Sequence, residues 1–231
     1  LLQRADVVIS VSEATKRGIL EYFDVNEAKI KVIPLGTYLI KPSFSSELAQ
    51  ILPKRYILFV GKRDFYKNFD RFFEAITPIL HKDSDLHLIC AGGGGFIKEE
   101  KEAISSAKLE KQVEYHPIVD DSTLGQLYGK AQVFVFPSLM EGFGLPVLEA
   151  MSCGCPVALT TGTSFDEIAE DAAVYFEPDQ IDSIKDAIEH VVYNDTLQNS
   201  MRLRGYERVP LFKAETTAQR TLETYKELVN I

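Results

Sequence analysis

Short apolar runs alternate with amphipathic helical patterns along most of the chain. The runs are rich in Val and Ile, and several are apolar at consecutive positions, as in strands that are covered on both faces. They occupy residues 6–11, 29–33, 55–60, 86–91, 132–136 and 156–160. Apolar residues at helical spacing occur at Leu124, Leu127, Tyr128 and Ala131, and again at Ile181, Ile184, Ile188 and Val191. This alternation predicts an α/β fold in which helices wrap a parallel sheet, the Rossmann-like doubly wound architecture.

The pattern also predicts how the chain is divided. Residues 55–208 form the predicted Rossmann-like domain, and a linker rich in Pro, Gly and Ser is expected at 37–54. Residues 1–36 contain two apolar strands, which cannot bury both of their faces alone, so they are interpreted as the end of a preceding domain. Residues 209–231 are expected to form a helix that packs toward that domain. The apolar face of this helix consists of Ala218, Leu222, Tyr225, Leu228 and Val229.

Composition narrows the classes of function. The chain has 45% hydrophobic and 26% charged residues, as ordinary soluble globular proteins do, and it starts at Leu1 rather than Met, which suggests a piece of a longer protein. A net charge of −9 with scattered basic residues argues against a nucleic-acid binder. Cys90, Cys153 and Cys155 form neither an even disulfide set nor a zinc spacing. We therefore expect a cytoplasmic protein, with peripheral association at the inner face of a membrane left open.

The strongest chemical signal lies in residues 137–157, where Glu141 and Glu149 stand eight positions apart around a Gly-Phe-Gly-Leu-Pro turn. The turn follows the predicted strand at 132–136, and Pro146 suits the first turn of a helix. In doubly wound sheets, ligands bind outside the carboxyl ends of the strands, at loops that lead into helices. The stretch is therefore predicted to be a ligand site.

The backbone of this turn is suited to an anion. The N–H groups of Phe143, Gly144 and Leu145 are predicted to point out of a helix N-terminus, where phosphate is the usual anion. Gly142 and Gly144 are expected to let the backbone come close to the ligand and adopt positive φ angles.

The two carboxylates suggest sugars on either side of that phosphate. Glu149 is predicted to lie about one turn into the helix, near the interior, where a lone carboxylate is costly and needs donors such as the two hydroxyls of a ribose. Glu141 precedes the turn and could bind a second polyhydroxy group. Together they predict a nucleoside diphosphate sugar. The alternative is that the glutamates only cap the helix or complement its dipole.

Several segments, in order along the chain, resemble those of retaining glycosyltransferases of family 4, the glycosyl transferases group 1, which have the GT-B fold. Glu141 and Glu149 match the E, seven residues, E motif of that family. The matching segments are "ADVVISVSEATKRGI", "KIKVIPLGT", "YILFVGKRDFYKNFDRFFEAI", "LHLICAGGG", "LYGKAQVFVFPS", "PSLMEGFGLPVLEAMSCGCPVALT" and "LFKAETTAQRTLETYKEL". The resemblance covers nearly the whole chain, and it implies the C-terminal, donor-binding half of a mannosyltransferase-like enzyme.

The resemblance also implies roles for residues. Glu149 would bind the ribose of the nucleotide, and Glu141 would hold hydroxyls of the donor sugar and stabilise positive charge that develops on its ring. The amides of Phe143, Gly144 and Leu145, with Gly142 beside them, would contact the diphosphate.

Two cations and a nucleobase contact follow from the same resemblance. Lys67 fits the lysine that faces the diphosphate. The matching arginine falls at Lys62 in many members and at Arg63 in a mannosyltransferase-like subset, and Arg63 is favoured because its planar fork grips two phosphate oxygens. A solvated turn at 62–67 is the alternative. Val119 is the expected nucleobase contact, with core packing as the alternative.

The implied reaction moves a hexose, with mannose favoured, from GDP-mannose or another nucleotide sugar to an acceptor hydroxyl in polysaccharide synthesis, with retention and without a cofactor or bound metal. The acceptor, a glycan or a lipid-linked sugar, stays undefined by these residues, and the N-terminal domain is expected to be missing or a separate chain. A nucleotide-sugar-binding subunit without turnover remains the alternative. An oxidoreductase would require a complete glycine fingerprint followed by an acidic residue, and the glycines at 92–95 do not supply it.

Overall fold

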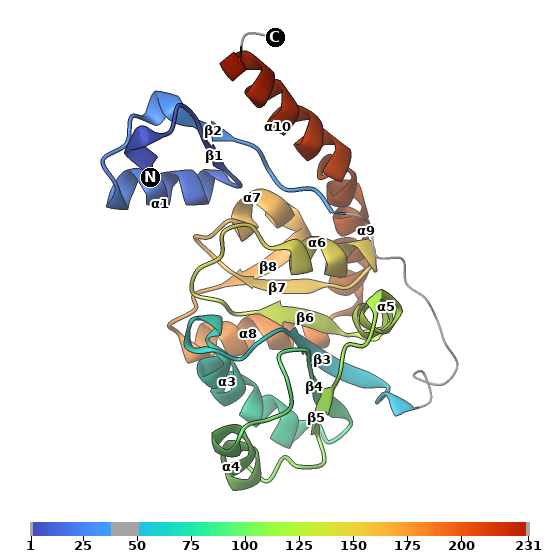
Figure 1. The fold of residues 1–231 in the computed structure, drawn as a ribbon. Helices are drawn as coiled ribbons and strands as arrows, with labels where there is room; N and C mark the ends of the chain where they lie inside the picture. The colour runs from blue at the N-terminus through green and yellow to red at the C-terminus, as the bar shows by residue number, and fades with distance from the viewer. Residues whose placement is uncertain (1, 38–50, 230–231) are drawn as a thin grey trace.

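The computed structural model describes residues 2–37 and 51–229 and contains a six-stranded parallel sheet with strand order β5-β4-β3-β6-β7-β8 (Figure 1). The strands are β3 (Arg55–Val60), β4 (Leu86–Ala91), β5 (Val113–His116), β6 (Val133–Phe136), β7 (Val157–Thr160) and β8 (Ala173–Phe176). Strands β3 and β6 lie side by side at the centre of the sheet. From β3 the chain adds strands toward one edge, and from β6 it adds them toward the other edge. The fold is therefore the predicted doubly wound α/β architecture, with its switch point at β3 and β6.

Helices cover both faces of the sheet. They are α3 (Phe69–Lys82), α4 (Lys98–Ser106), α5 (Asp121–Lys130), α6 (Leu145–Ser152), α7 (Phe165–Ala169), α8 (Ile181–Val192) and α9 (Asp195–Arg208). Buried residues of α5, α6 and α7 form one apolar cluster with one face of the sheet, and those of α3, α4 and α8 form a second cluster with the other face. Helix α9 contacts both α6 and α8.

Strand β3 shows why its apolar residues are consecutive. Leu58 and Val60 belong to the first cluster, whereas Ile57 and Phe59 belong to the second. Successive side chains of a strand point to opposite faces, so a strand covered on both sides needs apolar residues at every position. The prediction of two-sided strands is confirmed.

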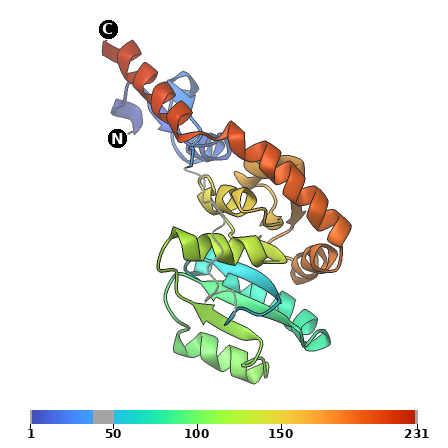
Figure 2. The ribbon, with the colours of Figure 1, turned by 90° about the vertical axis from the view of Figure 1, so that its right-hand side faces the viewer.

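A second, smaller unit lies at the N-terminus. Strands β1 (Val8–Ser10) and β2 (Ile30–Val32) form a separate two-stranded parallel sheet with α1 (Glu13–Tyr22) between them in sequence. Helix α10 (Ala214–Val229) extends from the larger unit to this one (Figure 2). Arg220 donates a hydrogen bond of 2.9 Å to the carbonyl of Val32. The division into domains stays a proposal, since most of the expected linker lies outside the described residues.

None of the helices in the described ranges is long and apolar enough to cross a membrane. Of the apolar residues expected on the face of α10, Leu222, Tyr225, Leu228 and Val229 are exposed. Helix α10 therefore contacts the N-terminal unit through polar groups, including Arg220 and the pair formed by Lys31 and Glu227 at 2.9 Å.

Candidate functional site

An ion pair lies where the two central strands end. Lys67 ends the one-turn 3-10 helix that follows β3, and Glu141 belongs to the loop that follows β6. The Lys67 ammonium contacts the Glu141 carboxylate, and the two side chains are only 13% and 17% exposed. The ammonium also lies 4.7 Å from the ring centroid of Phe136, whose π face attracts a cation. The structure thus brings together a cation and an acid that the sequence assigned to neighbouring parts of one ligand.

The turn between β6 and α6 depends on one glycine. Gly144 has a φ of 116°, and a Cβ atom added there would lie 2.7 Å from the ring of Phe165. The expected positive φ is confirmed for Gly144 and is wrong for Gly142, whose φ lies outside the left-handed region. A Cβ on Gly142 would meet the Thr15 hydroxyl at 3.7 Å, an ordinary contact.

Three backbone N–H groups at the entry to α6 are referred to as the anion site, after the role predicted for them. They belong to Phe143 and Gly144, which precede the helix, and to Leu145, its first residue, and they donate hydrogen bonds to no protein group within residues 2–37 and 51–229. Pro146 follows in the first turn of α6, as predicted. A helix N-terminus with free N–H groups favours negative charge.

Glu149 lies within α6 and is half-buried. Burial raises the pKa of its carboxyl above the ordinary value, the charge of Asp121 adds to this rise, and the Tyr128 hydroxyl opposes it. That hydroxyl donates a hydrogen bond of 3.5 Å, which is long. The half-buried carboxylate therefore has no strong hydrogen-bond partner among the described residues, and its burial is costly.

Arg63 lies apart from the Lys67 and Glu141 pair. Its Nε donates to the Glu100 carboxylate at 2.7 Å, and Nη2 donates to the carbonyls of Gly94 and Gly95 at 2.8 and 3.1 Å. The Arg63 side chain is only 4% exposed. These contacts tie it to the glycine loop that follows β4.

Lys62 is exposed, whereas the Arg63 side chain is covered, so the alternative of a solvated turn at 62–67 does not describe Arg63. No pattern in the sequence predicted Glu100 as the partner of Arg63. Glu100 also accepts a hydrogen bond of 2.8 Å from the backbone N–H of Ile97, the residue before α4. Because Ile97 has no side-chain acceptor, this contact leaves no capping-box pattern in the sequence.

Val119 lies in the loop before α5 and is 77% exposed. It lines a depression of about 340 Å³ together with Ile51, His116 and Pro117. The core-packing alternative is therefore wrong for Val119, and its contact with a nucleobase stays a proposal.

A larger cavity, of about 550 Å³, lies between α1 and the loops that follow β6 and β7. Glu141 lines it, together with Tyr22 and Phe23 from the end of α1 and Thr163 from the loop after β7. The sequence did not predict this cavity, because it requires the N-terminal unit to lie beside residues more than a hundred positions away.

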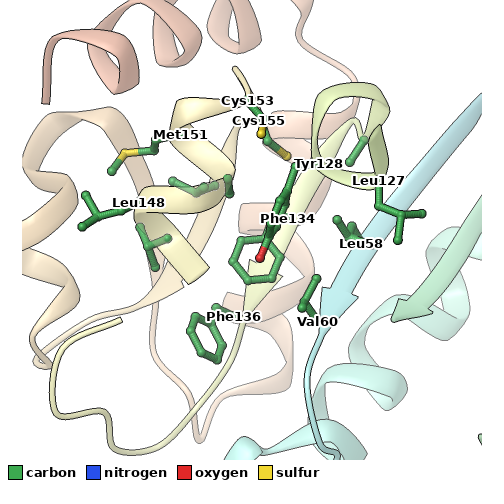
Figure 3. Packing of buried hydrophobic residues seen from close by; sticks show 14 of the residues in the cluster. Leu58, Val60, Leu127, Tyr128, Phe134, Phe136, Leu148, Met151, Cys153 and Cys155 are labelled. Atoms are coloured by element: carbon green, nitrogen blue, oxygen red, sulfur yellow. The ribbon is translucent and has the colours of Figure 1, made fainter. Parts of the chain in front are cut away.

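The cysteines pack in the interior. Cys153 and Cys155 lie beside Tyr128 in the first apolar cluster (Figure 3). Burial raises the pKa of all three thiols, including that of Cys90, so the reactive thiolate form is disfavoured. In the described part of the chain, no three His, Cys, Asp or Glu side chains are grouped closely enough to hold a metal ion.

Comparison with known proteins gives a consistent result. A family model described as glycosyl transferases group 1 matches residues 41–208. O-antigen chain mannosyltransferase B of Escherichia coli is 29% identical over 239 residues, which cover 98% of this chain and 62% of that protein. O-antigen chain mannosyltransferase RfbU of Salmonella typhimurium is 28% identical over 190 residues, covering 82% of this chain and 52% of that protein. The chain spans 62% or less of the length of these two relatives.

Solved structures share the arrangement of elements. Sucrose-phosphate synthase from Thermosynechococcus elongatus superposes with a TM-score of 0.85 at 25% identity, covering 99% of this chain and 60% of that one. The C-terminal domain of a glycosyl transferase group 1 family protein from Francisella tularensis gives a TM-score of 0.66 at 26% identity, covering 75% of this chain and 95% of that one.

Proposed function

Because the chain belongs to the glycosyl transferases group 1 family, we propose that it binds a nucleoside diphosphate sugar and takes part in transferring the sugar, with mannose favoured, to an acceptor hydroxyl with retention at the anomeric carbon. The observation that carries the proposal is the contact between Lys67 and Glu141 beside the anion site. A cation and free amides suit a diphosphate, and a carboxylate next to them suits the hydroxyls of a sugar.

The proposed chemistry uses charge that develops as the donor breaks. The bond between the anomeric carbon and the diphosphate cleaves, negative charge grows on the leaving oxygens, and the sugar ring becomes positive. The acceptor oxygen then bonds to the anomeric carbon on the face that the diphosphate leaves, and the proton of the acceptor hydroxyl passes to the leaving diphosphate. The Lys67 ammonium and the amides of the anion site stabilise the leaving group, most strongly in the transition state. Glu141 stabilises the ring and holds sugar hydroxyls. Glu149 accepts hydrogen bonds from the ribose, which would supply the donors that its half-buried carboxylate lacks.

Lys62 and Arg63 have different roles in this proposal. Arg63 uses its guanidinium to hold the glycine loop through Gly94 and Gly95, and its charge is already paired with Glu100. Lys62 is exposed on the same turn and is available to a phosphate. The proposal includes no bound metal, because Lys62, Lys67 and the amides of the anion site would neutralise the diphosphate. Val119 and its depression would face the nucleobase.

A second candidate is donor binding without turnover by this chain alone. The observation that favours it is that the chain spans 62% or less of the length of the mannosyltransferases it resembles. Groups that bind the acceptor would then come from a preceding domain, and the cavity beside Glu141 and α1 would be completed by it.

Calorimetric titration with GDP-mannose, UDP-glucose and ADP-glucose tests the proposal. The expected result is saturable binding, tightest for GDP-mannose, together with release of the nucleoside diphosphate when an acceptor is present. Binding with no release under any acceptor supports the second candidate. Failure to bind any nucleotide sugar at millimolar concentration would reject both.

A further inference from the structure

Three successive carbonyls in the turn before α6 accept hydrogen bonds from side-chain hydroxyls. The Gly142 carbonyl accepts two, from Ser12 Oγ at 2.7 Å and from Thr15 Oγ1 at 2.9 Å. Both donors come from the start of α1, more than a hundred positions away along the chain. The Ser12 hydroxyl also lies 2.9 Å from Thr15 Oγ1, and its single proton goes mostly to the shorter contact, with the Gly142 carbonyl.

Ser164, just before α7, holds the carbonyls on either side. Its hydroxyl is fully buried and lies 2.6 Å from the Phe143 oxygen and 3.1 Å from the Glu141 oxygen, with the shorter contact taking most of its single proton. Hydroxyls from two separate elements thus fix the direction of the carbonyls of residues 142 and 143.

Helix α1 is itself anchored. The carboxylate of Glu167, in α7, accepts hydrogen bonds from the backbone N–H groups of Glu13 and Ala14 at 2.8 and 2.6 Å. A carboxylate at a helix N-terminus is favourable for the helix dipole. Ser12 also accepts a hydrogen bond from the Thr15 N–H at 2.9 Å, which caps the helix. The two hydroxyls that reach Gly142 are therefore held in place from both sides.

Peptide geometry connects these contacts to the anion site. A peptide unit is planar, and its N–H points opposite to its C=O. Fixing the carbonyl of Gly142 fixes the N–H of Phe143, and fixing the carbonyl of Phe143 fixes the N–H of Gly144. These are two of the three N–H groups of the anion site. A loop with two glycines would otherwise have to lose conformational freedom each time it binds a ligand.

We propose that Ser12, Thr15 and Ser164 are positioning residues, whose hydroxyls orient the Phe143 and Gly144 amides for a diphosphate without touching it. The proposal rests on the proposed function, since it names what prepares the anion site. In this proposal, the contact between the N-terminal unit and the turn before α6 orients the anion site.

Isosteric variants at Thr15 give the sharpest test. Thr15→Val removes the hydroxyl and keeps the shape, whereas Thr15→Ser keeps the hydroxyl. The probe is inorganic pyrophosphate, measured by calorimetry, because it reports on the anion site without depending on the nucleobase. Thr15→Val is expected to weaken pyrophosphate binding about 3- to 10-fold, the equivalent of one ordinary hydrogen bond, and Thr15→Ser to stay within about twofold of the original.

Thr217→Val is the matched control. The Thr217 hydroxyl also donates to a backbone carbonyl, that of Pro34 at 2.8 Å, but lies on α10. Its loss is expected to change pyrophosphate affinity less than about twofold while lowering thermal stability by as much as Thr15→Val does. A merely structural role for Thr15 would make the two valine variants behave alike in binding.

Ser164→Ala is the second variant and is expected to weaken pyrophosphate binding by a similar factor. If the original chain binds pyrophosphate, and folded Thr15→Val binds it as tightly as Thr15→Ser does, the positioning role is overturned and the proposed function stands. If the original chain binds neither pyrophosphate nor a nucleotide sugar, the anion site itself is rejected, and the positioning role with it.

Discussion

The Lys67 ammonium contacts the Glu141 carboxylate although the two residues are 74 positions apart. Parallel pairing of β3 with β6 produces this contact, because it places the loops after the two strands at the same edge of the sheet. The pair neutralises itself while no ligand is bound, which lowers the cost of burying two charges. A diphosphate sugar would offer each partner a new contact of the same kind.

Replacing the cation is expected to weaken donor binding. Lys67→Met should reduce affinity for GDP-mannose about 10- to 100-fold, because a hydrogen bond to a charged group contributes about 1.5–3 kcal/mol. Calorimetry on the folded variant measures the change. Lys98→Met is the control, since the Lys98 side chain is 82% exposed and lies on α4. Equal affinities for the two variants would remove Lys67 from the site.

The charged Glu149 carboxylate is expected to lower the free energy of unfolding while it strengthens binding of the nucleotide sugar. Its folded-state pKa is raised, so its contribution to stability is complete below the ordinary glutamate pKa and is lost as pH rises through the raised value. Glu149→Gln should therefore melt at a higher temperature than the original chain at pH 7, by about 2–4 °C for each kcal/mol regained. The same variant should bind the nucleotide sugar more weakly.

The sign of this effect is checked by repeating the melting curves at lower pH. The advantage of Glu149→Gln should shrink as pH falls below the raised pKa and vanish below about pH 4. Glu102→Gln, at a side chain that is 66% exposed, is the matched control. An unchanged difference at pH 4 and pH 7 would mean that the carboxyl is not strained by burial.

The two glycines of the turn are expected to differ in their tolerance of a side chain. Gly144→Ala forces a non-glycine residue to a φ of 116° and against Phe165, and should lower the free energy of unfolding by about 1–3 kcal/mol or more. Gly142→Ala meets only ordinary contacts and should stay within about 0.5 kcal/mol. Urea denaturation compares them, and equal losses would contradict the turn geometry.

Arg63 is expected to act mainly on stability. Arg63→Ala leaves the Glu100 carboxylate, 10% exposed, without its partner, which typically costs about 3–5 kcal/mol. Adding Glu100→Ala should recover part of that loss, because the unpaired charge is removed. Denaturant unfolding of both single variants and the double variant measures the coupling. No recovery in the double variant would point to a role for Arg63 outside this pair.

The sequence predicted the central strands better than the edges of the sheet. Strands β3 and β4 are buried on both faces and appear as continuous apolar runs. Strands β5 and β8, at the two edges, each have one buried and three half-buried residues, so they leave no such run and were not predicted. An edge strand has a partner on one side only, and its side chains are less fully covered.

The candidate site shows the same limit. The turn, its glycine and its two glutamates are local, and their spacing predicted them. The pairing of Lys67 with Glu141 depends on which strands are neighbours, and the pairing of Arg63 with Glu100 depends on packing across 37 positions. Local spacing carries no information on either. The hydroxyls of Ser12 and Thr15 are separated from Gly142, which they contact, by 130 and 127 positions along the sequence.

The central claim is that a diphosphate binds at the amides that open α6. The most direct measurement is a titration of the ¹⁵N-labelled chain with GDP-mannose, followed through its backbone amide signals. The expected result is that the amides of Phe143, Gly144 and Leu145 shift most, because a hydrogen bond to phosphate changes the surroundings of those N–H groups directly. Saturating binding that shifts other amides and leaves these three unmoved would contradict the account.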